Sequence, residues 1–81
     1  MNDPDFPLYR KSANGLNWYR IASATEFTEV QHVGSRYVAH QVRALIYPER
    51  VRIAELTAME GGHVVVCEMA EFEAVLAKCG A

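Results

Sequence analysis

The side chains best suited to nucleophilic or acid–base chemistry in this 81-residue sequence are its cysteines and histidines. Cys67 and His63 suggest a thiolate and its base, which must lie within hydrogen-bond reach of each other. On one strand, four residues would separate them by about 13 Å, so they cannot make that contact there. His40 reaches Cys67 only if a neighbouring strand has the right register. We therefore expect Cys67 to be a small buried apolar residue and the chain not to be an enzyme.

The sequence also lacks the residue spacing of a metal or cofactor site. The three histidines follow no metal-ligand pattern, and Cys67 and Cys79 form no CxxC pair. Glu71 and Glu73 are two residues apart on a predicted helix, so they point to different sides. We expect solvated charges there rather than an acid–base pair. No metal and no cofactor are predicted, and both thiols are expected to be free.

Aromatic and arginine side chains on predicted strands have the greatest potential for binding. Alternation along the strands predicts that residues such as Tyr19 and Ile21 face the helices, and that the intervening residues face away. The predicted binding residues on that open face are Trp18, Arg20, Tyr37, Arg43 and Arg52. Such side chains are typical of protein interfaces, but they also stack bases and neutralise phosphates, or simply cover apolar rings with arginine stems. If the side chains of the second strand alternate in the opposite sense, Trp18 lies inside the protein. The case for a binding surface on the open face is then weaker.

Charge is unevenly distributed along the chain. Residues 6–52 carry seven basic and three acidic side chains, whereas residues 53–81 carry five acidic side chains and one lysine. This polarity suits an acidic partner or association of the chain with itself. The sequence pI of about 5.8 is low for a nucleic-acid-binding domain. We therefore predict a non-catalytic protein-interaction module, a homodimer through its open sheet face or a binder of an acidic protein, with single-stranded RNA binding as the alternative.

The start of the chain is predicted to form a β-hairpin, which positions the first of these binding residues. Residues 6–11 and 16–22 favour strands, and Asn14-Gly15 between them is a strong turn signal. Ser23 and Glu26 then have the spacing of a capping box. Together with the helix-ending residue Gly34, they predict a short helix over 24–33.

The rest of the chain predicts three strands and a final helix. Residues 36–46 form a long strand candidate, and 63–68 a short buried one. Pro48 and Gly61 could bound a helix over 51–59, but its apolar positions give no single face, so a strand with a bulge is favoured there. The predicted helix over 69–79 has a clear apolar stripe: Met69, Phe72, Val75, Leu76 and Cys79.

These elements predict one small α+β domain. Its mainly antiparallel sheet has four or five strands, the order is ββαβββα, and both helices pack on one face. We assign residues 6–81 to this domain and residues 1–5 to a disordered leader. No apolar run exceeds four residues, and the first residues lack a basic, apolar signal pattern. We therefore expect no membrane association and a cytoplasmic location.

Overall fold

The structure is a computed structural model and describes residues 6–44, 47–59 and 62–79. Its elements are β1 (Leu8–Ser12), β2 (Asn17–Ser23), β3 (Glu26–Val33), β4 (Arg36–Arg43), α1 (Tyr47–Ala58), β5 (Val64–Val66) and α2 (Met69–Leu76). They confirm the predicted α+β class, with a five-stranded sheet and two helices. The leader predicted for residues 1–5 lies outside the described residues.

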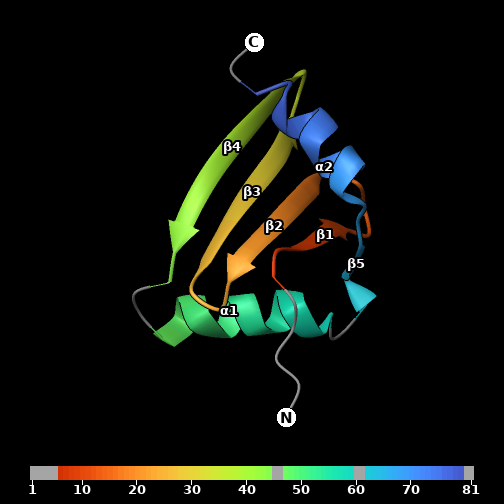
Figure 1. Ribbon diagram of the computed structural model, residues 1–81. Coiled ribbons are helices and arrows are strands. Elements are labelled where there is room, and N and C mark those ends of the chain that lie inside the picture. The colour runs from red at the N-terminus through yellow and green to blue at the C-terminus, as the bar shows by residue number, and fades with distance from the viewer. Residues whose placement is uncertain (1–5, 45–46, 60–61, 80–81) are drawn as a thin grey trace.

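The sheet is antiparallel throughout and has the strand order β4-β3-β2-β1-β5 (Figure 1). Strands β1 to β4 form a meander in which each strand pairs with the next. After β4 the chain passes through α1 and returns to the far side of β1, where it adds β5. Strands β4 and β5 are therefore the two edges of the sheet.

The hairpin predicted around Asn14-Gly15 is confirmed. Gly15 has a φ of 75°, a left-handed conformation that glycine adopts without steric cost. The hydroxyl of Ser12 accepts the backbone N–H groups of Leu16 and Asn17 at 3.2 and 3.0 Å. These bonds satisfy two backbone N–H groups at the turn and fix the geometry of the connection from β1 to β2.

The helix predicted over residues 24–33 is wrong, because this segment forms β3. Ser23 does accept a backbone N–H, but from Thr25 at 3.1 Å, within a tight turn between β2 and β3. The same hydroxyl chemistry thus serves a turn instead of a helix cap. Phe27 and Thr28 are adjacent and both buried, because both faces of the sheet are covered at this point. A strand covered on both faces loses the alternation that reveals strands in a sequence.

The strand predicted over residues 51–59 is also wrong, because this segment belongs to α1. Among residues 48–58 of this helix, only Ile53 and Leu56 are buried, so its apolar stripe is narrow. The guanidinium of Arg10, on β1, donates to the carbonyls of Leu56 and Thr57, both at 3.2 Å. These bonds satisfy carbonyls that the end of a helix leaves free. The order along the chain is consequently ββββαβα.

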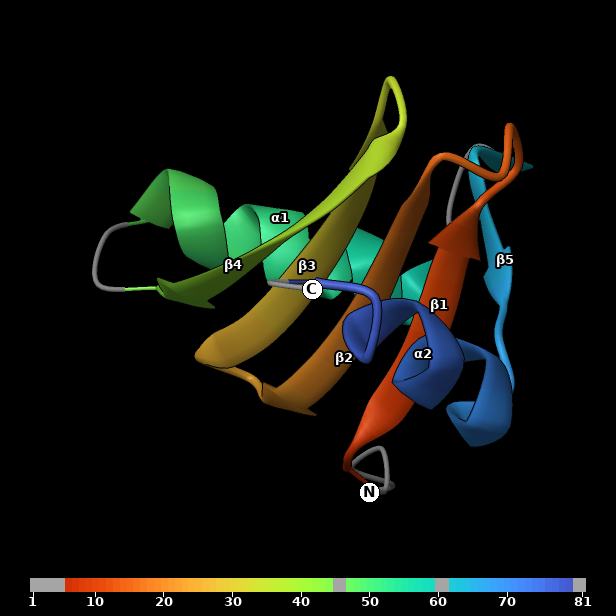
Figure 2. The same ribbon diagram turned by 90° about the horizontal axis from the view of Figure 1, so that it is seen from above.

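The two helices lie on opposite faces of the sheet, which corrects the prediction that both cover one face (Figure 2). The buried cluster against α1 contains Tyr19, Ile21, Phe27, Ala44, Ile53 and Leu56. The buried cluster against α2 contains Trp18, Val30, Cys67, Phe72 and Val75. Strand β2 supplies both clusters because its neighbouring residues, Trp18 and Tyr19, are both large and apolar. The helix predicted over 69–79 is confirmed for residues 69–76.

Candidate interaction site

The predicted binding residues do not form one open surface. Trp18, Arg20, Tyr37 and Arg43 come from β2 and β4, and the registers of these strands place them on the side of the sheet that α2 covers. Arg52 belongs to α1 and lies on the other side. The prediction of an uncovered face fails at its centre, because α2 packs there.

Trp18 is a core residue with one polar contact. Its side chain is 7% exposed, and its indole Nε1 donates to Glu71 Oε2 of α2 at 3.0 Å. The Lys11 ammonium lies 3.1 Å from the other oxygen of the same carboxylate. These two donors, the indole first, hold the pKa of Glu71 below its usual value. Trp18 therefore anchors α2 to the sheet and is not available to stack on a ligand.

Two of the predicted arginines cover aromatic rings inside the protein. The Arg20 guanidinium lies 5.3 Å from the centre of the Phe72 ring, and that of Arg52 lies 5.9 Å from the Tyr19 ring. Arg52 also donates to the Tyr19 hydroxyl at 3.4 Å. Cation–π contacts of this kind stabilise the fold, so these arginines have structural partners.

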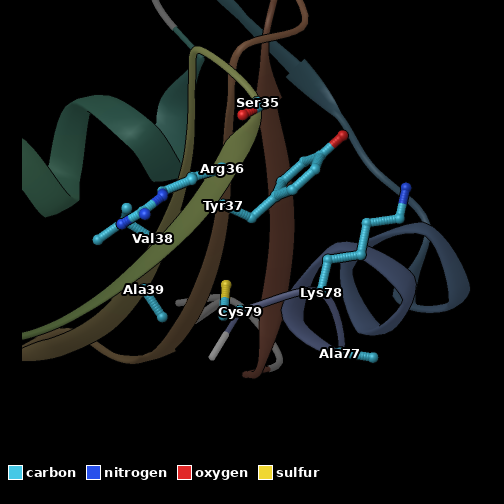
Figure 3. A pocket seen from close by; sticks show the side chains of 8 residues that line it. All are labelled: Ser35, Arg36, Tyr37, Val38, Ala39, Ala77, Lys78 and Cys79. Carbon is cyan, nitrogen blue, oxygen red and sulfur yellow. The ribbon is translucent and has the colours of Figure 1, made fainter. Parts of the chain in front are cut away.

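Tyr37 lies beside an open groove between β4 and the end of α2. The groove has a volume of about 970 Å³ and is lined by residues 35–39 and 77–79. Figure 3 shows Tyr37, Lys78 and the sulfur of Cys79 around this space. The Lys78 ammonium is 5.0 Å from the centre of the Tyr37 ring. The His32 ring stacks on this ring with centres 4.3 Å apart, and the Trp18 ring lies tilted against it at 6.0 Å. The groove thus offers an aromatic wall and a positive charge next to the edge of the sheet.

The backbone of β4 has hydrogen-bonding groups at this edge that no other strand of the described chain uses. The N–H of Ala44 donates to the carbonyl of Thr25 at 2.6 Å, which continues the ladder between β4 and β3. Residues of an antiparallel strand alternate in the direction of their peptide groups. Alternate residues of β4, beginning with Arg36, therefore bond to β3. The residues whose peptide groups face outward are Tyr37, Ala39, Gln41 and Arg43.

The side chains of β4 leave this edge accessible. Most of its eight residues are exposed, and Val38 is 37% exposed. Its register with β3 is unbroken from Arg36 to Arg43, whereas the register between β2 and β3 shifts after Ile21. A long straight edge without proline or bulge is a template for a further strand.

The sequence predicts the long strand over 36–46 but not its place at the edge of the sheet. The edge arises because the tight turn at Gly34-Ser35 pairs β4 with β3 and the chain then enters α1 instead of forming another neighbouring strand. This edge position was hidden because residues 24–33 were predicted to be a helix, which removed the partner of β4 from the predicted sheet.

The cysteine–histidine pair considered in the sequence is separated in the structure. Cys67 is buried under α2, where its thiol donates to the carbonyl of Glu68 at 3.3 Å. Burial, and then the nearby Glu71 carboxylate, raise the pKa of the Cys67 thiol. His40 is exposed on β4, and His63 lines a separate hollow beside α1. Cys67 is thus a small buried residue, as its sequence environment predicted.

Other kinds of site have little support in the part of the chain that the structure describes. Within residues 6–44, 47–59 and 62–79, no three or more His, Cys, Asp or Glu side chains are grouped to hold a metal ion. Neither helix there has the length and apolar character to cross a membrane. Comparison with protein families, with curated proteins and with solved structures finds no match to this chain.

Proposed function

We propose that this protein is a protein-interaction module that binds an extended polypeptide segment as an additional strand along β4. The observation that carries this proposal is the free edge of eight residues, in which four peptide groups face outward. A strand that pairs with them gains a ladder of backbone hydrogen bonds. Each such bond contributes about 0.5–1.5 kcal/mol net.

The groove beside β4 supplies the side-chain selectivity that backbone pairing lacks. Alternate residues of an added strand point to the α2 side of the sheet, where Tyr37, Lys78 and Cys79 surround the groove. An aromatic ring next to an ammonium favours an apolar or acidic side chain from the partner. The interaction site thus moves from the sheet face that the sequence suggested to the sheet edge.

Nucleic-acid binding has less support than strand addition. Trp18, the side chain best suited to stacking on a base, is buried under α2. Arg20 and Arg52 already lie over aromatic rings of the protein. A labelled single-stranded oligonucleotide therefore serves as the competing ligand in the test of strand addition.

The test uses a dye-labelled synthetic peptide with the sequence of residues 25–34, an acidic segment that already pairs with the inner side of β4. The informative variant is Ala39→Pro, because the Ala39 N–H faces outward and bonds to no strand of the sheet. Proline is tolerated at such an edge position but removes the donor and blocks the approach of a strand. Ala39→Ser is the matched control, since it keeps the N–H.

We expect the fluorescence anisotropy of the peptide to rise with protein concentration for the wild type and for Ala39→Ser. Ala39→Pro should weaken binding at least tenfold, which corresponds to about 1.4 kcal/mol, while its circular dichroism spectrum stays unchanged. Binding that is insensitive to Ala39→Pro, or no binding at protein concentrations where the wild type has the mass of a single chain, would contradict strand addition. If a labelled single-stranded oligonucleotide binds in place of the peptide, the nucleic-acid alternative is the better description.

A further inference from the structure

The free edge of β4 is complementary to itself, and we infer that its partner strand is β4 of a second copy of this chain. The two strands run antiparallel about a two-fold axis at His40. This inference rests on the proposed function and adds the identity and register of the partner. It is carried by the direction of the peptide groups, by the side chains that the register opposes, and by the charges around them.

The peptide groups fit this register. A two-fold axis perpendicular to the sheet pairs residues on the same face, and the same patch is used by both copies. With His40 on the axis, Ala39 lies opposite Gln41 of the second copy, and Tyr37 lies opposite its Arg43. All four residues have peptide groups that face outward, so both copies use every donor and acceptor of the edge.

The opposed side chains also fit. On the α1 side, Val38 lies opposite Val42 of the second copy, so two β-branched apolar residues meet. On the α2 side, Tyr37 meets Arg43 of the second copy, and this guanidinium brings with it the Glu26 carboxylate, the acidic group that the Lys78 ammonium beside Tyr37 favours. The charge of each Arg43 is already balanced, because Glu26 Oε1 of the same chain lies 3.3 Å away. Pairing therefore does not leave an isolated arginine charge between the two strands.

The neighbouring registers are less favourable. An axis at Ala39 places Val42 opposite Arg36, and His40 opposite Val38. An axis at Gln41 places Ala39 opposite Arg43. Each of these registers opposes an arginine of β4 to an apolar or small residue of β4. The register around His40 has no such pair, since its one unlike pair, Ala39 with Gln41, is uncharged. The sequence of β4 thus selects one register among those that keep its peptide groups paired.

The joined sheet would have ten strands, with β5 at each end. Both copies of α1 lie on one face of it and both copies of α2 lie on the other, because the axis preserves the two faces. The exposed Val38 is then covered by its neighbour in the second copy. A domain of 81 residues has a modest core, and association stabilises it by mass action.

Single cysteine substitutions along β4 test this register in the full chain. Each variant also carries Cys79→Ser, which removes the half-buried native thiol. Residues opposite each other at a non-hydrogen-bonded position have Cα atoms about 4.5 Å apart, which a disulfide can span. We expect His40→Cys to form a covalent dimer rapidly under mild oxidation. Ala39→Cys and Gln41→Cys should each crosslink slowly alone and rapidly when the two variants are mixed.

Light scattering after size exclusion completes the test. The wild type and Ala39→Ser should have about twice the chain mass of 9.1 kDa, and Ala39→Pro should have the single-chain mass. A wild-type monomer at high micromolar concentration would overturn the second copy as partner. Strand addition itself would still stand if the 25–34 peptide binds. A dimer in which His40→Cys fails to crosslink would overturn the register.

Discussion

The two edges of the sheet differ in length and in chemistry. Strand β4 has eight residues, four of which turn their peptide groups outward. Strand β5 has three, and the carbonyl of His63 and the N–H of Cys67 bond to β1, so the alternation leaves only Val64 and Val66 facing outward. Val66 is nevertheless 62% exposed, more than Val38 on β4. The more apolar edge is therefore the one less able to pair.

This contrast shows that the capacity of an edge for strand addition depends on consecutive free peptide groups, not on apolar exposure. A very short edge strand is one of the ways in which proteins prevent unwanted pairing. Strand β5 is short because Glu68 directly begins α2, and this helix anchors the region through Phe72. In residues 6–44, 47–59 and 62–79, no helix packs along the outer side of β4.

The largest expected effect is on the side of the sheet held by α2. Phe72 is fully buried and contacts the Tyr9 ring of β1, with ring centres 5.7 Å apart. Phe72→Ala should lower the free energy of unfolding by about 3–5 kcal/mol, because it leaves a cavity in the core. Val38→Ala on β4 should cost less than about 1 kcal/mol in the monomer.

Urea denaturation monitored by Trp18 fluorescence measures both variants, and the Ala39→Pro background keeps the chain monomeric for the comparison. Equal losses for Phe72→Ala and Val38→Ala would show that the two edges are equally anchored. That result would remove the physical basis for the difference between the two edges of the sheet.

A smaller effect, which depends on pH, is expected from the contact between α2 and the strands beneath it. The pKa of Glu71 is lowered in the folded protein by the indole of Trp18 and by Lys11. A carboxyl with a lowered folded pKa contributes stability above its unfolded pKa of about 4.3 and loses that contribution as the pH falls through the folded pKa. Glu71→Gln should thus be less stable than the wild type at pH 7, and the difference should shrink below about pH 4.

Urea midpoints of the two proteins between pH 7 and pH 2.5 measure this dependence. Glu73→Gln, an exposed glutamate on the same helix, is the matched control and should not change the pH dependence. A stability difference for Glu71→Gln that stays constant down to pH 2.5 would mean that its ionisation does not hold α2 in place.

The smallest effect concerns reactivity rather than stability, because each edge has a cysteine next to it. Cys67 follows β5, is buried, and has a raised pKa, whereas Cys79 is half-buried at the groove beside β4. The Cys67→Ala variant should therefore react with Ellman's reagent at pH 8 at least ten times faster than the Cys79→Ser variant. Similar rates would indicate that the β5 side opens as readily as the groove.

The sequence predicts those parts of the fold whose secondary structure is determined by one local signal. The Asn14-Gly15 turn and the apolar stripe of α2 depend on residues close together in the chain. The turn is confirmed, and the stripe is confirmed at Phe72 and Val75, whereas Met69 is exposed. The predictions of a helix over 24–33 and of a strand over 51–59 are wrong because tertiary packing determines the secondary structure of these segments. Strand β3 is covered on both faces at Phe27 and Thr28, and among residues 48–58 of α1 only Ile53 and Leu56 are buried.

The candidate site was harder to predict than the fold. Trp18 and Tyr37 are aromatic and on strands, but whether they are accessible depends on which face α2 covers. On that face, Cys67, Phe72 and Val75 pack with Trp18 and Val30, which are far from them in the sequence. The free edge of β4 depends on peptide groups, which every residue has, so side-chain composition carries no direct signal of it.

The position of β1 between β2 and β5 has a consequence for how the chain folds as it is synthesised. The register pairs Arg10 with Val66, so the first strand receives its second neighbour only after nearly all later elements exist. The meander from β1 to β4 can assemble early from neighbouring segments. The outer side of β1 stays unpaired until β5 and α2 arrive, and contacts of such high sequence separation are slow to form. A nascent chain that ends within α1 therefore exposes a second long edge, at β1, which the finished protein no longer has.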